Sequence, residues 1–134
     1  MKRSIENIVR HSEVSEKAIE AYLNKRAKES GLLCLKYSNA NTTGYPDRLI
    51  CLPDGKVVWV ELKSKGKKPN KLQAIRHEEL AKLGHVVWVI SSKEMVDNLI
   101  SYIEGEIAAK AEKAQVLGRT ADLVLALCCT KKYV

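Results

Sequence analysis

Gly44-Tyr45-Pro46-Asp47 and Val60-Glu61-Leu62-Lys63 are the two segments that decide how this chain is interpreted. Asp47 directly precedes one apolar run, and Glu61 and Lys63 lie at the end of the next. Side chains two positions apart in a strand point to the same face, so Glu61 and Lys63 share a face. If the two runs form a hairpin, Asp47 comes to the same end of the sheet. Two carboxylates beside a lysine can hold Mg²⁺ and a water molecule against a phosphodiester, so the pattern predicts phosphodiester hydrolysis.

Hydrophobic periodicity on both sides of these segments predicts the surrounding elements. Apolar side chains at spacings of three and four indicate a first helix, and Pro53-Asp54-Gly55 has the composition of a hairpin turn. Ser91 and Glu94 have the spacing of a capping box at the start of the last helix. The order is helix, three strands, helix, strand and helix, at residues 15–30, 32–37, 48–52, 56–63, 72–83, 85–90 and 91–103. This order predicts an α/β fold with a mixed sheet.

The strand expected at residues 56–63 is apolar on both faces, because residues 57–60 read Val-Val-Trp-Val. A strand of this kind is central in its sheet and covered on both sides. Glu61 and Lys63 then end a buried strand, where charged groups need partners or a metal ion.

The composition favours a single domain with a polyanionic partner. The chain has 134 residues and a net charge of +7, from 23 Lys and Arg against 16 Asp and Glu. A basic protein of this size most commonly binds nucleic acid, although ribosomal and membrane-surface proteins share the signature. The four cysteines form no Cys-x-x-Cys pair of a zinc site. The longest apolar stretch, residues 123–129, is far below the roughly 20 residues of a membrane span, so we expect a cytoplasmic protein with no membrane partner.

Taken together, these segments resemble the PD-(D/E)XK nuclease superfamily. Pro46-Asp47 and Glu61-Leu62-Lys63 match the two halves of its signature, and the lysine-rich Gly66-Lys67-Lys68-Pro69 loop and Gln73 are similar to its VRR-NUC branch. The resemblance implies a restriction-endonuclease-like αβββαβ core, with a mixed central sheet flanked by helices. We expect a nuclease domain at residues 12–103. Residues 104–134 would form a C-terminal extension, helical up to about residue 115 or dimer-forming.

The resemblance also implies roles for the residues of the two segments. Asp47, Glu61 and the Leu62 carbonyl would bind Mg²⁺, for which Mn²⁺ would substitute. Lys63 would orient the attacking water or stabilise the charge that develops on phosphorus. Gln73 would support the site by a hydrogen bond to water or phosphate.

A further carboxylate from the first helix commonly completes such sites, and two candidates exist. Glu16 and Glu20 are four residues apart and therefore neighbours on the helix surface. The VRR-NUC pattern suits Glu16, whereas the helix spacing of more distant relatives suits Glu20. We slightly prefer Glu16, and each taken alone is more often a solvated helix position.

Basic residues around the site are candidates for contact with nucleic acid. Arg48 would contact phosphate or pair with a carboxylate. The loop lysines are usually solvated, but beside a metal site they become phosphate contacts; they are Lys65, Lys67, Lys68 and Lys71. We interpret His77 as a surface helix residue.

These expectations combine into one functional prediction, a Mg²⁺-dependent endonuclease that hydrolyses DNA. No helix-turn-helix or zinc-finger signature is present, which favours nicking or cleavage of branched DNA, such as four-way (Holliday) junctions, over sequence-specific cutting. Symmetric cutting of two strands would suit a homodimer. Short members of this branch are common in phages, which would place the protein in the bacterial host cytoplasm. The alternative is a catalytically inactive nucleic-acid-binding module of the same fold.

Overall fold

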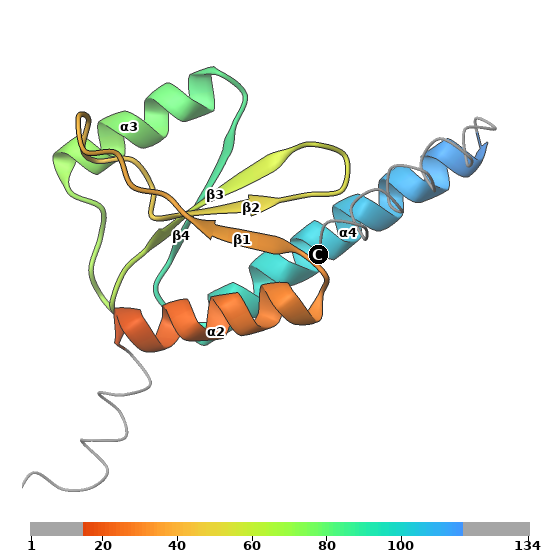
Figure 1. Ribbon diagram of the computed structural model, residues 1–134, viewed down its shortest axis with the longest axis horizontal. Helices are drawn as coiled ribbons and strands as arrows, with labels where there is room; N and C mark the ends of the chain where they lie inside the picture. The colour runs from red at the N-terminus through yellow and green to blue at the C-terminus, as the bar shows by residue number, and fades with distance from the viewer. Residues whose placement is uncertain (1–14, 117–134) are drawn as a thin grey trace, which may run out of the picture.

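The computed structural model describes residues 15–116. They form a four-stranded sheet with helices on both faces (Figure 1). The predicted αβββαβ order is confirmed, and a final helix follows it. The elements are α2 (Glu16–Glu29), β1 (Leu33–Lys36), β2 (Arg48–Cys51), β3 (Val57–Leu62), α3 (Lys71–Lys82), β4 (Val86–Ile90) and α4 (Lys93–Val116).

The sheet is mixed, as predicted, with the strand order β1-β2-β3-β4. The first three strands pair antiparallel, and β4 pairs parallel to β3. In this register Arg48 lies opposite Val60, and Leu62 lies opposite Ile90. β3 is therefore a central strand, which confirms the interpretation of its apolar run.

The main core lies between the sheet and the layer formed by α2 and α4 (Figure 1). In α2 the buried side chains are Ile19, Leu23 and Ala27, which recur every four residues and so form one helical stripe. They pack with alternate side chains of the strands and with α4, namely Ile50, Val58, Val60, Leu62, Ile90, Val96, Leu99, Ile100 and Ile103. This closely packed layer holds the strands rigidly in place.

Polar contacts fix α2 against α4 above that core. Asp97 of α4 accepts hydrogen bonds from the Tyr22 hydroxyl at 2.8 Å and from Arg26 Nε at 2.9 Å. The hydroxyl of Ser30, which follows the last residue of α2, donates to Glu104 of α4 at 2.9 Å and adds a further contact between the two helices. Both charged partners are partly exposed, so these bonds orient the helices more than they stabilise the fold.

α4 begins differently from the expectation and runs further than residue 103. Its first turn is capped by Ser92, whose hydroxyl accepts from the Met95 amide at 3.2 Å. The third residue after this cap is Met95, so the predicted capping box from Ser91 to Glu94 is wrong. The helix is continuous to Val116, and the apolar run at residues 121–129 lies outside the described residues. No helix between residues 15 and 116 is both long and apolar enough to cross a membrane.

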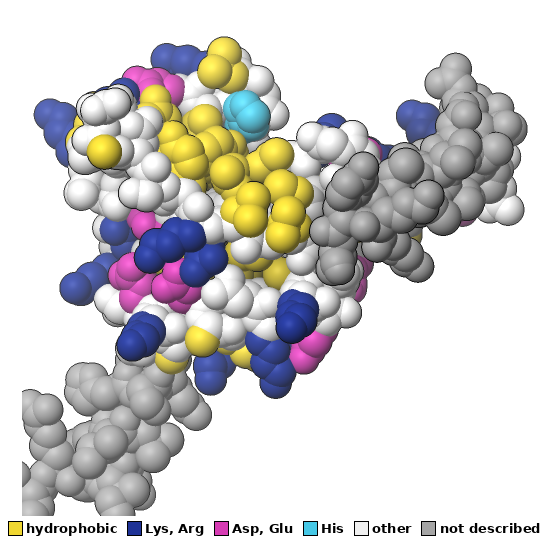
Figure 2. All heavy atoms as spheres, viewed as in Figure 1, with side chains coloured by type: hydrophobic (Ala, Val, Ile, Leu, Met, Phe, Trp, Pro, Cys, Tyr) yellow, Lys and Arg dark blue, Asp and Glu magenta, His cyan; other side chains and the backbone are white. Residues whose placement is uncertain are grey.

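α3 covers only part of the opposite face of the sheet. Figure 2 shows a band of exposed apolar side chains over the sheet beside α3. On the edge strand β1, Leu33 and Leu35 are 52% and 43% exposed, and Leu83 after α3 is 78% exposed. This open face contrasts with the sealed α2–α4 face.

Gly44 brings the loop before Asp47 against α3. Its φ of +93° lies in a region that side chains with a Cβ rarely adopt. A Cβ at this position would also lie 2.8 Å from Leu72 Cγ and 3.1 Å from Arg76 Cγ. Only glycine at position 44 therefore allows the loop to approach the start of α3 this closely.

Gly44→Ala should destabilise the protein more than the matched change Gly55→Ala. Both glycines have positive φ, but an added Cβ at Gly55 meets nothing within 4 Å. The backbone cost of about 1–2 kcal/mol is shared, so overpacking against Leu72 should add about 1–3 kcal/mol at Gly44. Urea unfolding of the two variants measures the difference. Equal losses of unfolding free energy would show that α3 moves away without cost.

Candidate active site

Asp47, Glu61 and Lys63 meet at one end of the sheet, as the hairpin hypothesis required. Asp47 immediately precedes β2, and Glu61 lies one residue before the end of β3. Asp47 Oδ2 accepts a hydrogen bond from the Leu62 amide at 2.9 Å. Lys63 Nζ lies 3.6 Å from Glu61 Oε1. Two carboxylates and an ammonium group therefore share one small volume.

The backbone holds Asp47 in place on two sides. Its carbonyl accepts from the Tyr37 amide at 2.8 Å, and its carboxylate accepts from Leu62 across the hairpin. Pro46, directly before it, is among the fully buried side chains. Asp47 is thus held by two main-chain amides, that of Tyr37 just after β1 and that of Leu62 in β3.

Glu61 is the charged side chain that is buried among residues 15–116, with 1% of its surface exposed. Burial raises the pKa of its carboxyl, and so does the neighbouring carboxylate of Asp47; Lys63 lowers it, and the result is a pKa of about 8. The raised pKa favours the protonated form of Glu61 when no cation is bound. Such a group is a candidate functional residue, because a small cation would satisfy both carboxylates at once.

Two side chains of α3 contact the two oxygens of Glu61. Gln73 Nε2 donates to Oε1 at 3.0 Å, and His77 Nε2 lies 3.4 Å from Oε2. Gln73 was expected to bond water or phosphate, and the structure places its amide on Glu61 instead.

The interpretation of His77 as a surface residue is wrong, because its side chain is only 15% exposed and faces Glu61. Burial, and then the charge of Lys63, lower the pKa of the His77 imidazole, which favours the neutral ring. The sequence does contain a signal for this position. His77 follows Gln73 by four residues, so both lie on the same face of the helix.

The two candidate carboxylates of α2 differ in their surroundings. Glu20 accepts from Arg48 Nε at 3.0 Å and also contacts Arg48 Nη2, while Glu16 is exposed. Within the described part of the chain, no group of three or more His, Cys, Asp or Glu side chains could hold a metal ion. The choice between Glu16 and Glu20 stays a prediction. For Arg48 the structure shows the carboxylate pairing, and contact with DNA stays a prediction.

The donor atoms at this site suit a small, hard cation. Carboxylate oxygens of Asp47 and Glu61 and a backbone carbonyl of Leu62 are the ligand types that Mg²⁺ prefers, and Mg²⁺ keeps several waters, so few protein ligands are needed. The exposed lysines Lys65, Lys67, Lys68 and Lys71 lie in or beside the loop that leads from Lys63 to α3. The site therefore combines two carboxylates with an adjoining loop of exposed lysines.

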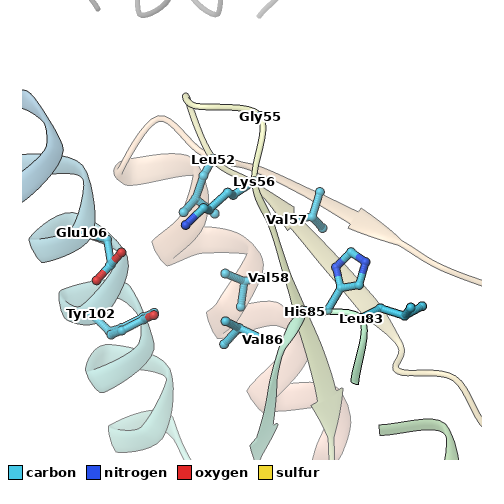
Figure 3. A pocket seen from close by; sticks show the side chains of 11 residues that line it. Leu52, Gly55, Lys56, Val57, Val58, Leu83, His85, Val86, Tyr102 and Glu106 are labelled. Carbon is cyan, nitrogen blue, oxygen red and sulfur yellow. The ribbon is translucent and has the colours of Figure 1, made fainter. Parts of the chain in front are cut away.

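A pocket lies at the end of the sheet opposite the candidate site (Figure 3). This pocket of about 320 Å³ is bounded by the β2–β3 turn, the α3–β4 turn and α4. In Figure 3, Tyr102 and Glu106 of α4 lie across from Lys56 and Val58. Its lining contains one carboxylate, Glu106, and lacks the paired carboxylates that phosphodiester chemistry requires.

The raised pKa of Glu61 should make stability depend on pH in the absence of divalent cations. The folded state binds this proton more tightly than the unfolded state, whose carboxyl has a pKa near 4.5. The free energy of unfolding should therefore fall as pH rises from about 5 to 8. His77 acts in the opposite direction below its ordinary pKa of 6.5. Subtracting the profile of Glu61→Gln from that of the wild type, by urea unfolding in EDTA, isolates the carboxyl. A flat difference would contradict the burial argument.

Comparisons with known proteins agree with the fold and the sequence motifs. No family model matches the sequence. A protein of Acyrthosiphon pisum secondary endosymbiont phage 1, "Putative nuclease p44", is 37% identical over 82 residues, which are 61% of this chain and 88% of that protein. A solved structure described as "VRR_NUC domain" aligns with a TM-score of 0.60 and 36% identity, covering 64% of this chain and 94% of that chain. The resemblance seen in the sequence is confirmed, and the chain belongs to the VRR-NUC nuclease family.

Proposed function

We propose that this nuclease is a Mg²⁺-dependent endonuclease that hydrolyses phosphodiester bonds in DNA. The observation that carries the proposal is the buried carboxyl of Glu61, held beside Asp47 and Lys63 with its pKa raised to about 8. Burying a carboxylate without a compensating charge is costly, and a second carboxylate beside it adds repulsion. A cation bound between Glu61 and Asp47 would compensate both, which supports a metal site.

The residues would divide the work as follows. Asp47, Glu61 and the Leu62 carbonyl would hold Mg²⁺, with Mn²⁺ as a substitute. A bound Mg²⁺ lowers the pKa of a coordinated water and neutralises charge on the phosphoryl oxygens. Lys63, whose side chain is 16% exposed, would orient the attacking water or stabilise the charge that develops on phosphorus. Gln73 would keep the Glu61 carboxylate in place through its 3.0 Å bond.

The lysine-rich loop would guide DNA to this centre. Lys65, Lys67, Lys68 and Lys71 are exposed and follow Lys63 closely in the chain. Lysine contacts to phosphate position a duplex without reading its sequence. Binding through such contacts supports selection of DNA by shape, and we therefore propose nicking or cleavage of branched DNA such as four-way junctions.

We also propose that the active form is a homodimer. Two strands of a junction are cut symmetrically when two active sites are related by a twofold axis. The edge strand β1 is short, with Leu33 and Leu35 exposed, and antiparallel pairing of two such edges is self-complementary. These exposed leucines support the dimer.

Supercoiled plasmid should be nicked by the wild-type protein with Mg²⁺ and left intact in EDTA. Asp47→Asn and Glu61→Gln should each reduce the cleavage rate by more than about 100-fold, because loss of an outer partner of a metal ligand alone costs up to about 100-fold. Glu78→Gln is the matched control, since this α3 carboxylate is 68% exposed and pairs with Lys82 on the surface. Gel densitometry of the nicked product gives the rates.

Two outcomes would contradict the proposed activity. Cleavage that survives EDTA or either site substitution would place the chemistry elsewhere. A folded wild-type protein that binds DNA but cleaves no plasmid, flap or junction would establish the inactive binding module instead.

A four-way junction should be cleaved faster than a linear duplex of matched sequence, because recognition by backbone and shape rewards a bent, accessible substrate. Analytical ultracentrifugation should give the mass of a dimer for the wild type and of a monomer for Leu35→Lys, which charges the β1 edge. Leu35→Lys should lose symmetric junction cleavage while keeping plasmid nicking. Equal rates on junction and duplex would remove the structure selectivity, and a monomeric wild type would remove the dimer.

A further inference from the structure

α3 presents Gln73 and His77 to Glu61 from positions one helical turn apart. The two side chains meet different oxygens of the same carboxylate, Gln73 on Oε1 at 3.0 Å and His77 on Oε2 at 3.4 Å. Lys63 approaches Oε1 as well, at 3.6 Å. His77 is therefore the side chain of α3 that contacts Oε2, and the loss of His77 removes the donor that α3 offers to this oxygen.

The cap of α3 fixes the orientation of Gln73. Its Oε1 accepts from the Asn70 amide at 3.0 Å, and Asn70 Oδ1 accepts from the Gln73 amide at 2.8 Å. This reciprocal pair is a capping box. Because Oε1 is engaged by the backbone, only the amide nitrogen of Gln73 is free to face Glu61. Gln73 thus acts as a donor of fixed direction to one oxygen.

A single donor does not fix the plane of a carboxylate. The terminal torsion of a glutamate is broad, so a group held at one oxygen still rotates about its last bond. A second donor on the other oxygen removes this freedom. Each carboxylate oxygen has two acceptor sites, so Oε2 keeps one for another partner after the His77 contact, whereas Gln73 and Lys63 both approach Oε1.

We propose that His77 is a positioning residue that sets the plane of the Glu61 carboxylate by donating from Nε2 to Oε2. This inference rests on the proposed metal-dependent function, because the plane of Glu61 decides where its remaining acceptor sites point. An ionised carboxylate only accepts, so the neutral ring must carry its hydrogen on Nε2. The His77 side chain is 15% exposed, so water competes weakly for the same oxygen.

The groups around Glu61 support a role of His77 in positioning the carboxylate rather than in general packing. The titratable groups that face Glu61 are Asp47 before β2, Lys63 after β3 and His77 on α3. Asp47 and Lys63 are held by the sheet, whereas Gln73 and His77 come from one helix. α3 therefore acts as a two-point support whose register relative to β3 determines the carboxylate plane.

The first test uses the wild-type protein without metal. Long-range ¹H–¹⁵N NMR of the imidazole reports which ring nitrogen carries the hydrogen, at a pH well above the Glu61 pKa of about 8, where the carboxyl is ionised and the ring is neutral. The Nε2–H tautomer is expected for His77. The Nδ1–H tautomer would overturn the proposal, and this result does not depend on metal binding or activity.

The second test compares His77→Phe, which keeps a ring without a donor, with His77→Gln, whose amide nitrogen reaches a similar position to Nε2. Titration calorimetry with Mn²⁺ should show about 10- to 100-fold weaker binding for His77→Phe, the usual effect of losing a partner behind a metal ligand, and recovery for His77→Gln. On plasmid, His77→Phe should lower kcat with little change in KM. His85→Phe is the matched control, because His85 is exposed and its ring lies 6.2 Å from Trp59, away from Glu61.

The outcomes separate this inference from the proposed function. Wild-type Mn²⁺ affinity in His77→Phe, or equal losses in His77→Phe and His77→Gln, would overturn positioning by a donor. If the wild type binds no Mn²⁺ and Glu61→Gln behaves identically, the metal-dependent function fails, and the tautomer of His77 alone decides the contact. Failure of His77→Phe to fold leaves His77→Gln and the tautomer as the deciding measurements.

Discussion

The burial of the Glu61 carboxyl beside Asp47 is the constraint on which the rest of the site depends. A carboxylate that is 1% exposed loses its hydration, and its neighbour of like charge adds repulsion. The fold offsets this cost locally with donors from two directions, Lys63 from the sheet and Gln73 and His77 from α3. None of these donors is a residue of the main core. The core on the α2–α4 face instead provides the stability that allows the opposite face to hold an unfavourable pair of charges.

The separation of the core face from the face that holds the site explains the placement of α3. The helix makes little apolar core, and Leu80 is its one buried residue in the described structure. Its position is set by polar geometry at its start, where Asn70 and Gln73 cap each other, and by the close approach of Gly44 to Leu72. A helix held in this way supports side chains for a site rather than sealing a core. The exposed apolar side chains left beside it are the consequence of that arrangement.

Much of the fold could be predicted from local patterns. The apolar run with Trp59 indicated a central strand, and the turn at Pro53–Gly55 indicated the hairpin that joins Asp47 to Glu61; both depend on neighbours in sequence. The pairing of Glu20 with Arg48 and the role of His77 depend on contacts between elements distant in sequence. Spacing places His77 and Gln73 on one helix face, but the angle of that face toward β3 is set by tertiary packing. Ser92 was misassigned for a related reason, because two adjacent serines offer equivalent local caps and only the packing of α4 selects one.

The same physics links the state of the site to the state of the protein. With a proton on Glu61, the repulsion from Asp47 is relieved and the metal-free fold is most stable; when the proton leaves, the two carboxylates require another positive charge. A cation that binds the folded state alone would supply it, and by mass action would raise stability with concentration. Proton and cation would then compete for one pair of carboxylates. The nearly complete burial of Glu61 strengthens that competition, since water screens it little. The feature that makes this end of the sheet unfavourable without a ligand is therefore the same one that would give it affinity for a divalent ion.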